Sequence, residues 1–133
     1  MNKCFFCQIA KGEIPSRKVY EDENFLAFLD IRPLTRGNTL VIPKQHYRWA
    51  DEVPNFGEYF EAAKKVGKAA KERLGAEWVS YITLGMEVEH AHIRVIPRYK
   101  NDGHPVLVKI DKFMKLTGEE LDEIAGKMRG EAI

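Results

Sequence analysis

The sequence predicts one α+β domain, in which an antiparallel sheet of about five strands packs against one long helix and a C-terminal helix on one side. Three observations support this. The 133 residues are enough for one hydrophobic core. Short segments rich in β-branched and aromatic residues follow one another through short connections, which favours antiparallel neighbours. Two longer segments repeat their apolar residues with a helical period instead.

The N-terminal third is expected to hold a short helix and three strands. Residues 5–10 can form a helix that ends before Gly12, and Ile14-Pro15 then favours an extended backbone. Three segments rich in β-forming residues follow and are predicted as strands: 18–20, 25–31 and 38–42.

The middle of the chain contains the clearest helical pattern. Apolar residues recur every three or four positions over residues 56–74, with charged residues on the opposite face, and Gly75 ends the run. Two more strands are predicted at 78–84 and 88–96, the second of them ended by Pro97.

The last third is expected to contain an edge strand at 106–110 and a final helix. Thr117 and Glu120 stand at the two ends of a capping-box sequence, which predicts that the last helix begins there. We assign no function to His104, which lies in a Gly-Pro loop and is expected to be solvated.

Charge and hydropathy exclude several classes of protein. The 21 basic and 20 acidic residues are spread along the chain and give a net charge of +1, so no basic surface suits a nucleic-acid polymer. Any phosphate that is recognised should therefore be local and small. No apolar run reaches the length of a secretory signal core or a membrane span. We therefore expect a cytoplasmic protein that does not bind membranes.

The two cysteines, Cys4 and Cys7, are three positions apart. They are too few for a disulfide-stabilised secreted domain and fit metal binding in a reducing compartment. A redox pair usually follows a strand and opens a helix, and no strand is predicted before Cys4, so redox use is less favoured. Two free, buried cysteines are the other interpretation.

Two histidines and an arginine alternate along the last predicted strand before the proline. Because side chains alternate across a strand, His90, His92 and Arg94 are expected on one face, with Glu87 and Glu89 on the other. Residues two apart lie about 7 Å apart at Cα, which suits successive contacts to one phosphoryl group. A row of polar side chains on a solvated sheet face is the alternative.

Residues 85–98 resemble the signature of the histidine triad (HIT) family, His-x-His-x-His followed by apolar residues. The resemblance extends, in order, to five shorter segments: 4–7, 12–16, 20–23, 28–31 and 37–46. It covers about residues 4–100. We therefore expect residues 1–100 to form a HIT domain and residues 101–133 to form an extension that contains a helix and packs on it.

The resemblance implies nucleotide binding and hydrolysis. Members of the family bind nucleoside phosphates and typically cleave nucleoside phosphoramidates, dinucleoside polyphosphates or nucleotidyl conjugates, and some branches transfer the nucleotidyl group. By position, His92 would be the nucleophile, while His90 would orient it or bind a metal. A nucleotidyl-histidine would form and then be hydrolysed by water, which divides one difficult displacement into two easier ones.

The resemblance also implies a site for a purine nucleoside monophosphate or a nucleotidyl conjugate. Asp30 matches the carboxylate that accepts hydrogen bonds from the ribose, although a turn carboxylate is the alternative interpretation of this residue alone. Arg94 would hold the phosphate. Four apolar side chains are expected around the nucleoside: Phe6, Leu26, Phe28 and Ile42. Members are commonly homodimers.

Four residues match, by type and order, the zinc ligands of the cysteine-bearing bacterial and archaeal branch: Cys4, Cys7, His46 and His90. Two thiolates and two imidazoles satisfy tetrahedral zinc, and a closed site of this kind is structural. The resemblance therefore implies one structural zinc ion.

The chain departs from the family pattern at the third histidine, which is Arg94. An arginine can bind phosphate but cannot donate a proton to a leaving group. Met86 and Glu87 replace a glutamine or hydroxyl residue, and the usual asparagine of the preceding loop is missing, so the phosphate pocket is short of donors. Three interpretations follow: a hydrolase acting through His92, a non-catalytic mononucleotide-binding module, or a nucleotidyltransferase.

Overall fold

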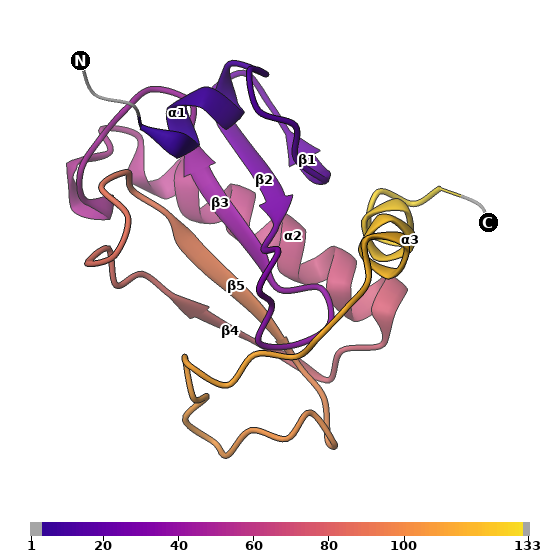
Figure 1. Ribbon diagram of the computed structural model, residues 1–133. Coiled ribbons are helices and arrows are strands. Elements are labelled where there is room, and N and C mark those ends of the chain that lie inside the picture. Colours follow the sequence, from indigo (N-terminus) through magenta and orange to yellow (C-terminus); the bar gives the residue numbers. More distant parts are fainter. Residues whose placement is uncertain (1–3, 132–133) are drawn as a thin grey trace.

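A five-stranded antiparallel sheet is the framework of the protein (Figure 1). The structure is a computed structural model that describes residues 4–131. In chain order the elements are α1 (Phe5–Ala10), β1 (Lys18–Glu21), β2 (Phe25–Leu29), β3 (Thr39–Pro43), the short 3₁₀ helix η1 (Ala50–Glu52), α2 (Phe56–Leu74), β4 (Trp78–Ile82), β5 (Ile93–Arg98) and α3 (Gly118–Met128). The strands lie in the order β1-β2-β3-β5-β4, and all neighbours are antiparallel. The predicted α+β class and antiparallel sheet are confirmed.

The two longer helices have the ends that the sequence predicted. α2 ends at Leu74, and Gly75 follows in the left-handed region with φ of 78°. α3 has the predicted capping box: the Thr117 hydroxyl accepts from the Glu120 amide at 3.0 Å, and the Glu120 carboxylate accepts from the Thr117 amide at 2.8 Å. α3 packs against α2 and β1. Among the helices of residues 4–131, none has the length and apolarity needed to cross a membrane.

Helices cover both faces of the sheet, not one face as predicted. α2 and α3 lie on one face, against strand residues that include Ala27, Val41 and Val95. The short α1 lies on the other face, as Figure 1 shows. Its cluster contains six buried residues: Phe6, Ile9, Leu26, Phe28, Leu40 and Ile42. The one-sided prediction is wrong because every residue of β2 and β3 is buried, so both of their faces need an apolar cover.

β5 lies further along the chain than the predicted strand 88–96. It spans Ile93–Arg98, so His90 and His92 belong to the loop before it. Pro97 does not end the strand. The Arg98 carbonyl accepts from Glu77 on the β4 side, so Pro97 faces the β3 side, where the pairing of β3 with β5 has already stopped at Val95. A missing amide proton is tolerated at such an unpaired position.

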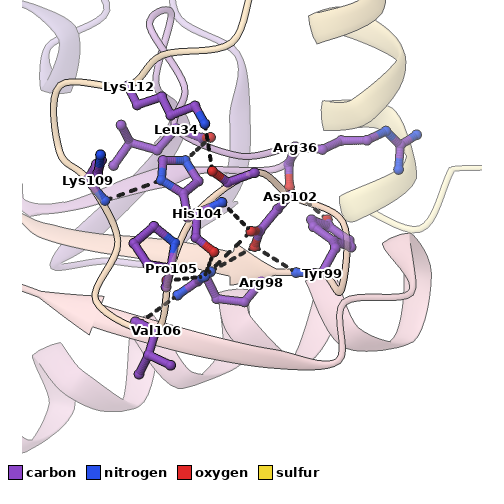
Figure 2. A network of polar contacts seen from close by, with 11 residues as sticks. Leu34, Arg36, Arg98, Tyr99, Asp102, His104, Pro105, Val106, Lys109 and Lys112 are labelled. Atoms are coloured by element: carbon purple, nitrogen blue, oxygen red, sulfur yellow. Dashed lines mark hydrogen bonds and ion pairs between the residues drawn. The ribbon is translucent and has the colours of Figure 1, made fainter.

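A buried ion pair organises the segment between β5 and α3 (Figure 2). Arg98 is only 2% exposed, and its Nε donates to Asp102 Oδ2 at 2.8 Å. The same guanidinium donates to the backbone carbonyls of residues 104–106. The strand predicted at 106–110 is wrong: at the start of that range, the Val106 carbonyl accepts from Arg98 and not from a neighbouring strand.

His104 belongs to this network, so the expectation that it is solvated was also wrong. Its Nε2 donates to the Leu34 carbonyl at 2.9 Å, and its Nδ1 accepts from the Lys109 amide at 3.2 Å, as Figure 2 shows. A carbonyl can only accept and an amide can only donate, which defines the tautomer of the ring. His104 therefore joins the segment between β5 and α3 to the loop before β3.

Asp102→Asn is expected to destabilise the protein by about 3 kcal/mol, because it leaves the buried Arg98 without its counter-charge. Burial opposes ionisation of Asp102, but hydrogen bonds from Arg98 and two backbone amides prevail and lower its pKa to about 2. A carboxyl whose pKa is lowered on folding stabilises the protein above its unfolded pKa, near 3.8. That contribution is lost as the pH falls toward 2.

Urea unfolding at pH 7 and pH 3 checks this prediction. Asp102→Asn should lower the free energy of unfolding more at pH 7 than at pH 3, because in the wild type part of the stabilisation by ionised Asp102 is already lost at pH 3. Asp111→Asn, an exposed aspartate of the same segment, is the matched control and should change the free energy of unfolding by less than about 0.5 kcal/mol. Equal stability of wild type and Asp102→Asn at pH 7 would contradict the role of the ion pair.

Candidate functional site

A cavity of about 490 Å³ opens on the sheet face that carries α1. Its walls come from α1, from the end of β2, from the loop before β5 and from the segment before α3. Five of the residues predicted to form the site line it: Phe6, Phe28, Asp30, His92 and Arg94. The structure therefore brings together residues that are up to 88 positions apart in the sequence, as the spacing of Phe6 and Arg94 shows.

His92 is buried in the cavity wall and is 3% exposed. Its Nδ1 lies 2.9 Å from the His90 carbonyl oxygen. Since a carbonyl can only accept, Nδ1 carries the proton and Nε2 keeps its lone pair. Burial lowers the pKa of His92, and the nearby Arg94 charge lowers it further. The ring is therefore held neutral at physiological pH, with one defined nitrogen available to attack an electrophile.

Arg94 follows on β5, and its side chain is 13% exposed. Its Nη2 is 3.4 Å from Glu87 Oε1, and both residues line the same cavity as His92. The prediction that Glu87 points to the opposite face is wrong, because Glu87 lies in a loop where strand alternation does not apply. Among residues 4–131, Arg94 Nε is one of two buried side-chain atoms without a hydrogen-bond partner.

Asp30 comes directly after β2 and lines the cavity. Its amide donates to the Asn38 carbonyl at 3.0 Å, and its Oδ1 accepts from the Arg32 amide at 2.9 Å. Burial raises the pKa of Asp30, although the Arg32 amide and the Arg94 charge oppose that rise. Asp30 therefore closes a local turn through Oδ1 and also lines the cavity.

Aromatic rings form the apolar wall. The Phe6 ring packs edge-on against Phe28 and against His92, with centroid distances of 5.6 Å in both pairs. Leu26 and Ile42 are fully buried beneath them and are not among the residues that line the cavity. The structure thus places two of the four predicted apolar residues at the surface that a base can reach.

The segment before α3 also reaches the cavity, which the sequence did not indicate. Phe113 is a lining residue, and the Arg32 guanidinium stands 4.2 Å from the centre of its ring. The Met114 amide donates to the Pro33 carbonyl at 2.9 Å. Phe113 and Arg32 are functional candidates that no motif marks, whereas Glu87 lies within the signature segment but was expected on the opposite face.

A second cluster lies beside the cavity, where α1 meets the sheet. It consists of four residues whose ligand atoms all lie within 4.8 Å of one another: Cys4, Cys7, His46 and His90. The Sγ to Nδ1 distances are 3.2 Å for Cys4 to His90 and 3.3 Å for Cys7 to His46. Ligand atoms of tetrahedral zinc are separated by about 3.3–3.8 Å, from Zn–N near 2.0 Å and Zn–S near 2.3 Å. The donor set and its spacing therefore fit zinc.

His90 connects the cluster to the cavity. Its Nε2 donates to the Pro43 carbonyl at 2.9 Å, so its Nδ1, which faces the two thiols and His46, is free of a proton. Its own backbone carbonyl accepts the proton of the His92 ring. A metal ion held in the cluster would therefore also fix the carbonyl that orients His92.

Comparison with protein families matches residues 11–101 to the HIT domain. The chain belongs to the histidine triad family. This HIT protein is 40% identical to an uncharacterised HIT-like protein of Methanocaldococcus jannaschii, over 96% of the chain and 99% of the relative. Its fold is similar to the crystal structure of a zinc-bound histidine triad protein from Mycobacterium smegmatis, with a TM-score of 0.78 and 33% identity over 96% of the chain and 91% of that protein.

A plant relative with a named activity is also similar to this HIT protein. It is the adenylylsulfatase HINT3 of Arabidopsis thaliana, 34% identical over 76% of the chain and 55% of the relative. The HIT protein thus spans about half the length of that enzyme. The family is one of nucleotide-binding hydrolases, and the cysteine and histidine cluster fits its zinc-binding branch.

Proposed function

We propose that this HIT protein hydrolyses purine nucleoside 5′-phosphoramidates or related nucleotidyl conjugates through a covalent intermediate on His92. One observation carries the proposal. A buried, neutral imidazole has its Nδ1 proton bound to a backbone carbonyl, and it lines an apolar cavity together with an arginine and carboxylates. This is the arrangement that a nitrogen nucleophile requires for attack on a phosphorus atom.

The cavity residues suit the three parts of a nucleotide. Phe6 and Phe28 offer ring surfaces for a base, and Asp30 Oδ2 offers an acceptor for ribose hydroxyls. Arg94 supplies the positive charge next to His92 that an α-phosphate needs. The same residues account for the expected ligand class, a purine nucleoside monophosphate or its conjugate.

In the proposed reaction, His92 Nε2 attacks the α-phosphorus and forms a P–N bond while the bond to the leaving group breaks. The leaving group takes the electron pair of the broken bond and obtains a proton from water, because Arg94 cannot donate one. Water then attacks the nucleotidyl-histidine, which releases a nucleoside monophosphate and regenerates neutral His92. Arg94 stabilises the negative charge that builds up on the phosphate in both steps.

We also propose that the cluster of Cys4, Cys7, His46 and His90 holds a structural zinc ion. Zinc bound there joins α1 to the sheet and closes its own coordination with four protein ligands. It thereby holds Phe6 and the His90 carbonyl in place. A homodimer remains a prediction, for which Trp78 and Tyr81 on the edge strand β4 offer exposed apolar surface.

A non-catalytic mononucleotide-binding module is the second candidate, favoured by the arginine in place of the third histidine. Release of a fluorescent amine from adenosine 5′-tryptamine phosphoramidate separates the two functions. Turnover that yields AMP supports the hydrolase. AMP binding without release of the amine supports the module, and an adenylyl group found on an added acceptor and not on water supports a transferase.

Asp30→Asn is expected to weaken adenosine binding about tenfold, because a charge-assisted hydrogen bond to the ribose is replaced by a neutral one. Burial raises the pKa of Asp30, so the carboxylate is neutralised at a higher pH than an exposed aspartate. The affinity of the wild type should therefore fall on acidification through this raised pKa. The variant should lack that part of the pH dependence.

Calorimetric titrations with adenosine from pH 7.5 to pH 4.5 measure this effect. Adenosine replaces AMP because its ribose is the same but it has no phosphate that titrates in this range. Asp111→Asn serves as the control, since it removes an exposed carboxylate outside the cavity. Identical affinities and pH profiles for the wild type and Asp30→Asn would show that Asp30 only closes its turn.

A further inference from the structure

A carboxylate stands beside the arginine that faces the cavity. Glu87 Oε1 is 3.4 Å from Arg94 Nη2, and both side chains line the cavity with His92. The two members of the pair differ in exposure, since the Arg94 side chain is 13% exposed and that of Glu87 is 82% exposed. Arg94 is therefore the inner member, and Glu87 stands at the rim.

The loop that carries Glu87 is held in place at Gly85, which contacts Arg48 and Trp49. Gly85 adopts φ of +74°, and a Cβ atom there would lie 3.0 Å from the Trp49 ring. The Arg48 side chain donates to the Gly85 carbonyl at 2.6 Å and stacks over Trp49 at 3.8 Å. Glu87 thus extends from an anchored position toward the cavity.

Glu87 and the nucleoside-facing residues come from different parts of the strand order. Phe6, Phe28 and Asp30 belong to α1 and the end of β2, whereas the Glu87 loop connects β4 and β5 at the other edge. If the ribose lies at Asp30 and the phosphate at His92 and Arg94, the remaining substituent of that phosphate lies near this loop, because Glu87 contacts Arg94. That substituent is the leaving group.

We infer that Glu87 is a specificity-determining residue that selects the leaving group, disfavouring anionic leaving groups and admitting neutral or cationic amines. This inference rests on the proposed function. Glu87 stands next to Arg94 at the rim, so a second anionic group beyond the α-phosphate meets a carboxylate there. Of the two other arginines that line the cavity, Arg17 pairs with Asp122 at 2.7 Å, and Arg32 stacks on Phe113 and lies two residues after Asp30, where the ribose is proposed to bind.

Binding of a non-hydrolysable nucleotide tests the inference without depending on turnover. AMP and α,β-methylene-ADP differ by one anionic group beyond the α-phosphate. Glu87→Gln should increase the affinity for α,β-methylene-ADP about tenfold more than it increases the affinity for AMP. A change of this size is expected when one like charge about 6 Å from the second anionic group is removed at the rim of a protein. Glu89→Gln, an exposed glutamate that does not line the cavity, is the matched control and should leave the ratio unchanged.

Turnover provides the second measurement. The ratio of kcat/KM for adenosine 5′-tryptamine phosphoramidate over adenosine 5′-phosphosulfate should fall about tenfold in Glu87→Gln. An unchanged binding ratio in Glu87→Gln, or an equal change in Glu89→Gln, would overturn the inference. If the wild type turns over neither substrate, the proposed hydrolase fails, while the binding ratio still decides whether Glu87 discriminates by charge.

Discussion

Replacing His92 with alanine is expected to lower kcat for adenosine 5′-tryptamine phosphoramidate by about 10⁴-fold or more. The loss is large because the reaction depends on one unprotonated nitrogen, His92 Nε2, whose orientation follows from the hydrogen bond of Nδ1 to the His90 carbonyl. The measurement is the rate at which the fluorescent amine is released at saturating substrate concentration.

Two further measurements separate loss of chemistry from loss of structure. The Kd of His92→Ala for AMP should lie within about fivefold of the wild-type value. The base still has Phe28 as its partner, the ribose has Asp30 and the phosphate has Arg94. Rapid quenching with substrate labelled in the α-phosphate should trap a labelled protein in the wild type and none in His92→Ala. A variant that keeps more than a tenth of wild-type turnover would place the nucleophile elsewhere.

Removal of zinc is expected to lower the free energy of unfolding by about 4 kcal/mol, for a zinc concentration about 1,000 times its Kd. The reason is the size of α1, which has only six residues and is too short to be stable alone. It is held by Phe6 and Ile9, which are buried against the sheet, and by the two cysteines at its start. Without metal, the thiols of Cys4 and Cys7 no longer attach α1 to His46 and His90.

Metal analysis and thermal unfolding with and without a strong chelator check this prediction. One zinc per chain is expected, and the double variant Cys4→Ser/Cys7→Ser should match the chelated wild type. Because α1 carries Phe6, the affinity for AMP should also fall about tenfold in both samples. A metal-free wild type whose melting temperature does not respond to zinc would instead favour the interpretation of two free, buried cysteines.

Local patterns in the sequence were sufficient for the helices, and the family motif was sufficient for the residues of the metal cluster. The apolar period and Gly75 predicted both ends of α2, and Thr117 with Glu120 predicted the start of α3. These features depend on residues within a few positions of one another. The four cluster residues could be predicted because the family motif already relates positions that are distant in the chain, and the structure brings their ligand atoms together.

Strand boundaries and the loop residues of the site needed the tertiary structure. The backbone of residues 104–106 follows the buried Arg98 and forms no strand, a consequence of a side chain on β5. Glu87 turns toward Arg94, although alternation along a strand predicted the opposite. The predicted period did not apply there because β5 begins only at Ile93.

The sequence by itself thus determined the family, the fold class, the amphipathic helices and which residue types are available for phosphate and metal. The tertiary structure alone decided that Glu87, Arg32 and Phe113 share the cavity with His92, and that His104 is a structural residue. The physical reason is that secondary structure follows short-range periodicity, whereas the path of a loop depends on a few long-range contacts. The polar anchors at Arg98 and Gly85 are contacts of this kind.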